Sequence, residues 1–378
     1  MADIAGTLRE APMTKTTCDV FSAGANAGNS GEAVSDASDR TGSLASSTCK
    51  AGNVRRSKLA RLLALVTVAV TACGVSGTLP REYTDKPGPT TPAPERFYAD
   101  PDSLAAAWVR SHPDDPMAAE IQADIAAQPA ARWFGDGSGD IGPAVSRYVA
   151  AAKAMRRTPI LVAYDIPLRD CGQYSKGGAA SMYAYRQWIS AFAAGIGASQ
   201  AVVVVEPDAL AQLDCLSAQA QSDRLDLLRY AAAQFKGQAP NARVYLDIGH
   251  SGWLSTTVAA SRLAAAGVAD VRGFSLNVSN FKTTVDSASY GRSIAALLAQ
   301  EGLAKTFLVD TSRNGNGPLA SQWCDPPGRR LGEEAMAYAD GGVPEMTLWI
   351  KNPGRADGCA AAAGTFVPHL ADRLIHGT

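Results

Sequence analysis

Residues 159–166 have the sequence PILVAYDI, a short and nearly continuous run of apolar and β-branched residues. Such a run is typical of a parallel strand that is buried on both faces of a sheet. Similar runs recur after intervals of roughly thirty to forty residues, most of which have the pattern of Ala-rich amphipathic helices. These runs are 202–205, 244–248, 273–278, 306–309 and 346–350, and a further strand is expected to end at Arg132-Trp133-Phe134. The alternation predicts an α/β fold with a parallel sheet.

Polar residues follow almost every one of these runs: Asp165, Asp170, Asp208, Asp247, Asn277, Asn280, Asp310, Lys351 and Asp357. In a β/α barrel the carboxyl ends of the strands form the active-site face, so these side chains would meet in one cleft. A doubly wound open sheet is the alternative, and it would gather them at one crevice. The first strand is not followed by a G-x-G-x-x-G sequence, so the pattern does not indicate a dinucleotide site.

Composition and missing motifs narrow the chemistry. The chain of 378 residues has 35 Lys and Arg against 36 Asp and Glu, which argues against a nucleic-acid partner. The sequence has neither a G-x-S-x-G nor an H-E-x-x-H motif, and of its four His only His250 lies near a strand end. We therefore expect metal-free and cofactor-free chemistry that two carboxyl groups can perform.

The segment before residue 96 is expected to direct export. Residues 1–54 are a low-complexity leader predicted to be disordered, and residues 55–73 combine a basic cluster with an apolar run too short to span a bilayer. The sequence around Cys73 resembles the bacterial lipoprotein box, with plain cleavage after Ala72 as the alternative. Residues 74–95 are a Pro/Thr-rich linker, so 96–378 would be the catalytic domain. A secreted or cell-surface location follows, without a transmembrane span.

The folded part holds four cysteines, Cys171, Cys215, Cys324 and Cys359. In an oxidising compartment an even number indicates two disulfides, for which the sequence permits three pairings. A zinc site is disfavoured because no two of them have C-x-x-C spacing and no His lies near them at ligand spacing.

Aromatic residues near the strand ends suggest a sugar substrate. Trp133, Trp253 and Trp323 lie beside Asp and Gly rather than within apolar helical stripes. Flat aromatic faces suit the apolar C–H face of a pyranose ring. Glycoside hydrolysis needs a protonated carboxyl group to donate to the leaving oxygen and a carboxylate to activate water or attack the sugar. The predicted cleft supplies both kinds of group.

At seven segments the chain resembles glycoside hydrolase family six, the secreted cellulases, and among them most of all the actinobacterial endoglucanases. The segments, in the family order, are LVAYDIPLRDCGQYSKGGA (161–179), VVVVEPDAL (202–210), VYLDIGHSGWL (244–254), GFSLNVSNF (273–281), VDTSRNGNGP (309–318), QWCDPPGRRLG (322–332) and LWIKNPGRADGC (348–359). The resemblance implies a distorted, incomplete parallel β/α barrel of about seven strands. It also implies hydrolysis of β-1,4-glucan with inversion at the anomeric carbon.

The resemblance also implies roles for particular residues. Asp208 matches the general acid, and Asp170 the carboxylate that raises the pKa of the acid and helps to organise the hydrolytic water. Asp357 matches a second carboxylate that has been proposed as the base, a role the family leaves unsettled. Tyr164 matches a tyrosine that crowds the sugar ring at the cleavage site. Substrate-binding positions are Trp133, Asp247, His250, Trp253, Asn280, Trp323 and Lys351.

Disulfides Cys171–Cys215 and Cys324–Cys359 are likewise implied by the resemblance. Two positions depart from the family: Lys176 stands where a small residue is usual, and Arg355 where Glu is usual. Either change could impair or redirect activity, or both side chains could simply point into solvent. The short segment after Asp357 indicates an open cleft, and an open cleft favours cutting at internal bonds of the glucan. We expect the protein to be a monomer. The rival hypothesis is a non-hydrolytic glucan-binding protein on the same scaffold.

Overall fold

A computed structural model describes residues 96–338 and 342–378 of the chain. The expected leader, the export signal with Cys73 and the expected linker all lie outside these residues. The α-helices are α1 (Leu104–Ser111), α2 (Ala118–Ile121), α3 (Ile141–Ala154), α4 (Met182–Ile196), α5 (Ala218–Gln238), α6 (Thr256–Ala265), α7 (Thr284–Gln300) and α8 (Pro368–His376). None of the described helices is long and apolar enough to cross a membrane.

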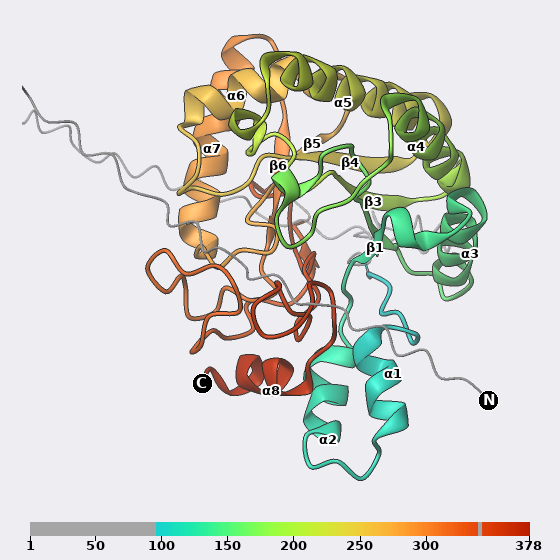
Figure 1. The fold of residues 1–378 in the computed structure, drawn as a ribbon, viewed down its shortest axis with the longest axis vertical. Helices are drawn as coiled ribbons and strands as arrows, with labels where there is room; N and C mark the ends of the chain where they lie inside the picture. The colour runs from blue at the N-terminus through green and yellow to red at the C-terminus, as the bar shows by residue number, and fades with distance from the viewer. Residues whose placement is uncertain (1–95, 339–341) are drawn as a thin grey trace, which may run out of the picture. The chain divides into compact units, whose positions relative to one another are not determined.

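One curled sheet forms the centre of the fold (Figure 1). Its strands are β1 (Arg132–Phe134), β2 (Ile160–Ala163), β3 (Ala201–Val205), β4 (Ala242–Asp247), β5 (Gly273–Leu276), β6 (Thr306–Asp310), β7 (Met336–Ala337) and β8 (Met346–Leu348). The order is β1-β2-β3-β4-β5-β6-β8-β7, and every neighbouring pair is parallel except β7 with β8. The expected seven parallel strands are therefore confirmed, whereas the two-residue antiparallel β7 was not expected.

The barrel is incomplete because β1 and β8 form no ladder with each other. Instead, the residues beside them are joined by single bonds. Ala131 N donates to Trp349 O at 2.8 Å, and Trp133 Nε1 donates to Ile350 O at 2.7 Å. Asn352 Nδ2 donates to Ala131 O at 2.8 Å. These hydrogen bonds connect the two edges of the sheet near β1 and β8. They do not continue the strand pairing, so the sheet stays open to a cleft.

Both faces of the strands are buried, which explains their continuous apolar sequences. Alternate residues such as Leu161 and Val203 belong to the core beneath the surrounding helices. Their neighbours, such as Val162 and Val204, belong to a second core inside the curl of the sheet. A strand buried on one face only would need a polar residue at every second position.

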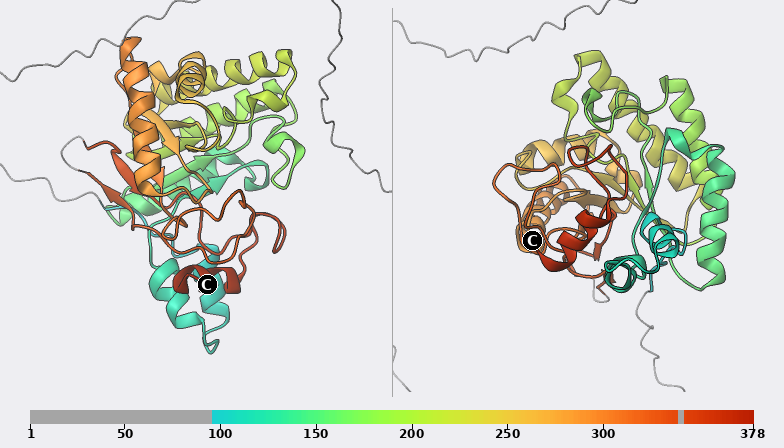
Figure 2. Two further views of the ribbon diagram at one scale, coloured as in Figure 1. Left: turned by 90° about the vertical axis from the view of Figure 1, so that its left-hand side faces the viewer. Right: turned by 60° about the horizontal axis from the view of Figure 1, so that its bottom comes forward.

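Helices α3 to α7 cover the outer face of the sheet (Figures 1 and 2). Several begin at a hydroxyl residue whose side chain accepts a hydrogen bond from a backbone N–H three residues later, including Ser181, Ser217, Ser255 and Thr283. Such caps satisfy amide groups that the first turn leaves unpaired. Short capped helices of this kind return the chain to the next parallel strand.

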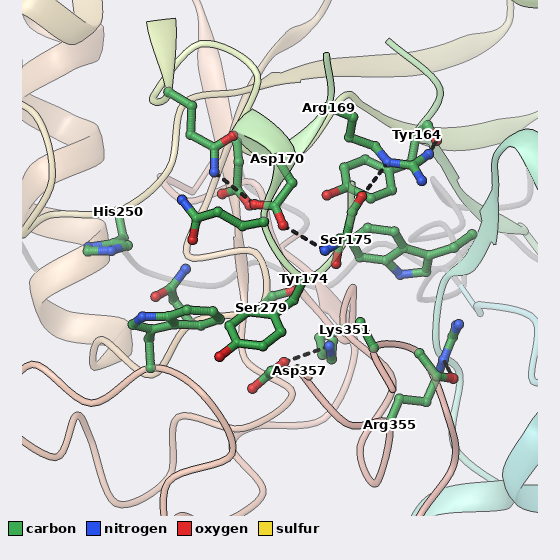
Figure 3. A pocket seen from close by; sticks show the side chains of 18 of the residues that line it. Tyr164, Arg169, Asp170, Tyr174, Ser175, His250, Ser279, Lys351, Arg355 and Asp357 are labelled. Carbon is green, nitrogen blue, oxygen red and sulfur yellow. Dashed lines mark hydrogen bonds and ion pairs between the residues drawn. The ribbon is translucent and has the colours of Figure 1, made fainter. Parts of the chain in front are cut away.

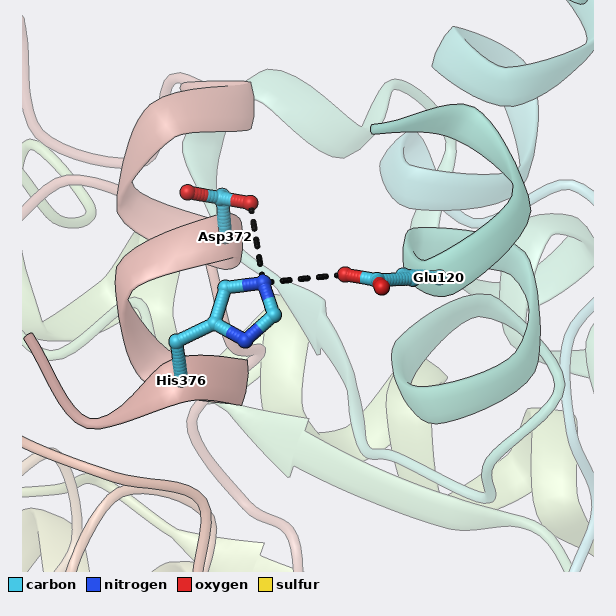
Figure 4. A group of neighbouring side chains, drawn as sticks. All are labelled: Glu120, Asp372 and His376. Carbon is cyan, nitrogen blue, oxygen red and sulfur yellow. Dashed lines mark ion pairs between the residues drawn. The ribbon is translucent and has the colours of Figure 1, made fainter. Parts of the chain in front are cut away.

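At the opposite end of the fold, α1, α2 and α8 pack together, so the beginning and the end of the described chain meet (Figure 2). His376 on α8 contacts Glu120 on α2 at 2.9 Å and Asp372 at 3.4 Å (Figure 4). The three side chains are 32% to 53% exposed, so these contacts add at most about 1 kcal/mol to the free energy of unfolding. They lie outside the cleft described next.

Candidate active site

A cleft of about 1020 Å³ opens at the carboxyl ends of the parallel strands. It is lined by most of the expected site residues: Trp133, Tyr164, Asp170, Asp208, His250, Trp253, Asn280, Trp323, Lys351 and Asp357. The four cysteines form the disulfides Cys171–Cys215 and Cys324–Cys359. The topology thus brings together side chains from β1 and from the segments that follow six further strands, as expected for the active-site face of a β/α barrel.

The backbone at these strand ends adopts conformations that are unfavourable for most residues. Positive φ angles occur at Asp170, Glu206, Asp208, Asn277 and Ser279, all directly after a strand or in the loop that follows it. Each such conformation costs about 1 to 3 kcal/mol and persists only where the surrounding structure enforces it. The cleft therefore concentrates local strain, as functional sites commonly do.

Asp208 has the properties of a proton donor. Its Oδ1 is buried and has no hydrogen-bond partner among the described residues. Burial raises the pKa of this carboxyl group well above its ordinary value, and the nearby carboxylates of Asp247 and Asp170 raise it further. Asp208 therefore holds its proton to higher pH than an ordinary aspartate does, and it lies in the wall of the cleft.

Asp247 lies beneath Asp208 and does not line the cleft. Its side chain accepts hydrogen bonds from Asp208 N at 2.8 Å, Gly249 N at 3.0 Å and Ser275 Oγ at 2.9 Å. Burial raises its pKa to about 7 even though these bonds favour the charged form. Asp247 thus holds the backbone of Asp208, and the substrate-binding role expected for Asp247 stays a prediction.

The carboxylate of Asp170 is held in place by two hydrogen bonds (Figure 3). Its Oδ2 accepts from Ser175 N at 2.7 Å, and its Oδ1 accepts from Gln212 Nε2 at 3.1 Å. Gln212 comes from the segment after β3, which the disulfide Cys171–Cys215 ties to the Asp170 loop. Two segments far apart in the sequence therefore fix one carboxylate beside the proton donor.

A buried pair below the Asp170 loop anchors its beginning. Glu206 is fully buried and accepts hydrogen bonds from the backbone of Asp165 and Ile166 at 3.0 to 3.1 Å, and burial raises its pKa to about 7. Arg224 donates to the carbonyl groups of Pro167 and Leu168 at 3.0 and 2.8 Å. Glu206 stands two positions before Asp208 among the acidic residues that follow the strands, whereas no sequence signal indicated Arg224, and neither residue lines the cleft.

Asp357 differs from Asp208 because it is fully paired. Its carboxylate accepts from Lys351 Nζ at 2.7 Å and from Arg313 Nη1 at 2.9 Å, and Asp325 N donates to it at 3.2 Å. Burial acts to raise its pKa, but Arg313 and Lys351 outweigh burial and hold the pKa at about 2. Asp357 therefore stays ionised at neutral pH and is a weak proton acceptor.

We expect Asp357→Asn to lower the free energy of unfolding by about 3 to 5 kcal/mol, because it leaves two buried cations without their counter-ion. The low pKa sets the sign with pH: the stabilisation is full above the ordinary value of 3.8 and is lost as pH falls towards about 2. Urea unfolding at pH 7 and at pH 3 measures both effects.

Asp226→Asn is the matched control, because Asp226 forms an exposed ion pair with Arg229 on α5. Removing such a pair changes the free energy of unfolding by less than about 1 kcal/mol. Equal losses of unfolding free energy in the two variants would contradict the conclusion that Asp357 stabilises the fold by pairing with the buried cations Arg313 and Lys351.

Aromatic side chains form flat surfaces along the cleft. The Trp133 ring meets the Tyr164 ring edge to face, with 5.1 Å between centroids. Trp253 and Trp323 are 38% and 46% exposed, which is unusual for Trp unless a ligand covers it. Tyr174, which the sequence analysis did not name, packs against Trp323 with 5.8 Å between centroids. These exposed rings can stack on sugar rings.

His250 lies near Trp253 on the opposite side of Figure 3 from Arg355. Burial and the positive charge of Lys282 lower the pKa of His250 to about 4, so its ring is neutral at pH 7. Its Nδ1 accepts a hydrogen bond from Gly252 N at 3.1 Å. A neutral imidazole with Nδ1 as acceptor keeps its other nitrogen as a donor for a hydroxyl group.

Lys176 and Arg355, the two residues that depart from the family pattern, both lie at the cleft. Arg355 is partly buried and lines it, so the interpretation that this side chain points into solvent is wrong. Lys176 is exposed on the Asp170 loop and also lines the cleft.

A half-barrel whose cleft holds one carboxyl group with a raised pKa and one with a lowered pKa, flanked by exposed aromatic rings, is typical of a hydrolase of polysaccharides. The family model for glycosyl hydrolases family 6 matches residues 92–372. The chain therefore belongs to glycosyl hydrolases family 6.

Similar proteins agree with this assignment. Endoglucanase 1 of Streptomyces halstedii is 47% identical over 288 residues, which cover 74% of this chain and 88% of the relative. Endoglucanase A of Thermobispora bispora is 42% identical over 323 residues, covering 84% of this chain and 69% of the relative. The solved structure of endoglucanase Cel6 from Mycobacterium tuberculosis superposes with a TM-score of 0.71 at 42% identity, covering 75% of this chain and 98% of that one.

Proposed function

We propose that this protein is an exported endo-β-1,4-glucanase that inverts the anomeric carbon, with Asp208 as the general acid. The observation that supports this best is the environment of Asp208: a buried carboxyl group with a raised pKa and a free oxygen, in a cleft that also holds the ionised Asp357. The names of the relatives, which are endoglucanases, support the same activity.

In the proposed reaction, Asp208 donates its proton to the glycosidic oxygen as the bond to the anomeric carbon breaks. One water molecule attacks that carbon from the opposite face of the ring and forms the new C–O bond. The excess proton of this water leaves through solvent held at Asp170, whose carboxylate is fixed by Ser175 N and Gln212. We do not assign the base role to Asp357, because a pKa of about 2 makes it a poor acceptor.

The remaining residues of the cleft would bind the glucan. Tyr164, held between the Trp133 ring and the guanidinium of Arg169, would crowd the ring at the cleavage site. Exposed Trp253 and Trp323 would stack on units further along the chain. Because the segment from Asp357 to α8 is short, we infer an open cleft that accepts internal bonds of a polymer.

The location of the enzyme is a separate proposal. We infer export from the basic and apolar pattern of residues 55–73 and from the two disulfides, which persist in oxidising compartments. Lipidation at Cys73 would retain the enzyme at the cell surface as a monomer facing its polymeric substrate.

The activity is tested with the purified protein on hydroxyethyl cellulose, a neutral soluble β-1,4-glucan, by following viscosity and reducing ends together. Internal cutting lowers viscosity well before many reducing ends appear, and optical rotation of the early products reports inversion. Binding of cello-oligosaccharides without any release of reducing ends would instead support the non-hydrolytic alternative.

A further inference from the structure

Positive charge exceeds negative charge around Asp357. Arg313 and Lys351 share its single carboxylate, and their side chains are only 4% and 13% exposed. Lys351 also lies near enough to Arg313 and Arg355 for both cations to lower its pKa. Three cationic side chains therefore lie in this group, against the carboxylates of Asp357 and of Asp325, whose Oδ1 accepts from Asp357 N at 2.7 Å. Figure 3 shows Lys351, Arg355 and Asp357 at this side of the cleft.

Arg355 is the member of this cluster that lacks an anionic partner. Its Nε donates to Gly364 O at 2.8 Å and its Nη1 to Asn352 Oδ1 at 3.0 Å, and both acceptors are neutral. Burial lowers its pKa, and no neighbouring carboxylate opposes that effect. A partly buried cation without a counter-ion is costly, and a ligand anion would remove the cost.

The third nitrogen of Arg355, Nη2, is kept available. It makes no hydrogen bond to any described residue, and Arg355 lines the cleft. A Cβ atom at Gly364 would come within 2.9 Å of Nη2, so glycine at this position leaves the approach open. Two neutral acceptors thus fix the guanidinium plane, and Nη2 is left without an acceptor on a side chain that lines the cleft.

Elsewhere in the cleft, Lys282 and Lys176 add further positive charge. Lys282 is held through its backbone, since its N–H donates to Asn277 Oδ1 at 2.9 Å, and its charge reaches His250. Neither lysine forms an ion pair with a described residue. The cleft lining holds five cationic side chains, those of Arg169, Lys176, Lys282, Lys351 and Arg355, against the four carboxyl groups of Asp136, Asp170, Asp208 and Asp357. The cleft therefore carries a small excess of positive charge although the whole chain has a formal net charge of -1.

We propose that the preferred substrate is a β-1,4-glucan bearing carboxylate groups, such as one in which some glucosyl units are oxidised at C6 to glucuronosyl units. Arg355 receives one of these carboxylates. The planar guanidinium fork matches a carboxylate better than it matches a hydroxyl group. This inference rests on the proposed function, because it names the class of glucan for the same site.

The test compares cello-oligosaccharides before and after partial oxidation at C6, so that the backbone is the same in both. We expect wild-type kcat/KM to be higher on the oxidised pool. Arg355→Gln should lower the ratio of oxidised to neutral kcat/KM by about tenfold, and Arg355→Lys should retain more of it. Lys236→Gln, which removes a cation paired with Asp270 away from the cleft, should leave the ratio unchanged.

A second measurement needs no variant: raising the salt concentration should reduce the wild-type preference for the oxidised pool. An arm with oligosaccharides oxidised only at C1 distinguishes an internal from a terminal carboxylate, and the proposal requires the larger ratio with C6 oxidation. Hydrolysis of the neutral pool with no preference for the oxidised one would overturn this inference alone. No hydrolysis of either pool would overturn the proposed function.

Discussion

Asp208→Asn is expected to lower kcat on neutral soluble β-glucan by about 10³-fold while the Kd for cello-oligosaccharides stays nearly the same. Asn has almost the same shape as Asp and tolerates the positive φ angle of 68° at this position, so the fold should be retained. The loss arises because an amide cannot supply the proton that the leaving sugar oxygen needs. Steady-state kinetics and isothermal titration calorimetry measure the two quantities.

The chemistry of the leaving group provides the control for Asp208→Asn. A nitrophenyl cello-oligosaccharide releases a stable phenolate and needs little help from an acid. The variant should therefore lose far less activity on this substrate than on glucan. An equally large loss on both substrates would mean that Asp208 acts on something other than leaving-group protonation.

Asp170→Asn is expected to lower kcat by about 100-fold and also to change its pH dependence. The proposed acid works only when protonated, so activity falls as pH rises through the pKa of Asp208. Because the charge of Asp170 contributes to raising that pKa, removing the charge lowers it, and the alkaline limb of kcat should move to lower pH. A pH profile of kcat on hydroxyethyl cellulose measures both changes.

Asp214→Asn is the matched control for Asp170→Asn. Asp214 precedes Cys215 on the other side of the same disulfide, but its exposed carboxylate pairs with Arg262 and does not line the cleft. Its loss should leave the alkaline limb in place. If the alkaline limb of kcat also stays in place in Asp170→Asn, the carboxyl groups of Asp170 and Asp208 do not interact.

The parallel strands could be predicted from sequence because burial on both faces leaves a signal in every residue of a strand. The runs at 159–166 and 202–205 contain β2 and most of β3. Strand β7 left no such signal, because Met336 and Ala337 form only a short antiparallel edge beside β8. A two-residue strand has no periodicity to detect.

Residues that support the site were harder to predict than residues within its motifs. Gln212 and Arg313 act through contacts with Asp170 and Asp357 at sequence separations of 42 and 44 residues. Nothing in a single sequence pairs such positions. The surroundings of Asp247 could not be predicted for a similar reason, since its position after a strand does not reveal that Asp208 N, Gly249 N and Ser275 surround its carboxylate.

The sequence by itself determined which strands run parallel and which acidic side chains follow them, because burial and chain order are properties of the chain. Only the tertiary structure decided the charge of those acids. Asp208 and Asp357 are chemically identical, yet one has a raised pKa and the other a pKa of about 2. A pKa depends on burial and on neighbouring charges in space, and those neighbours come from distant segments that meet only when the sheet curls.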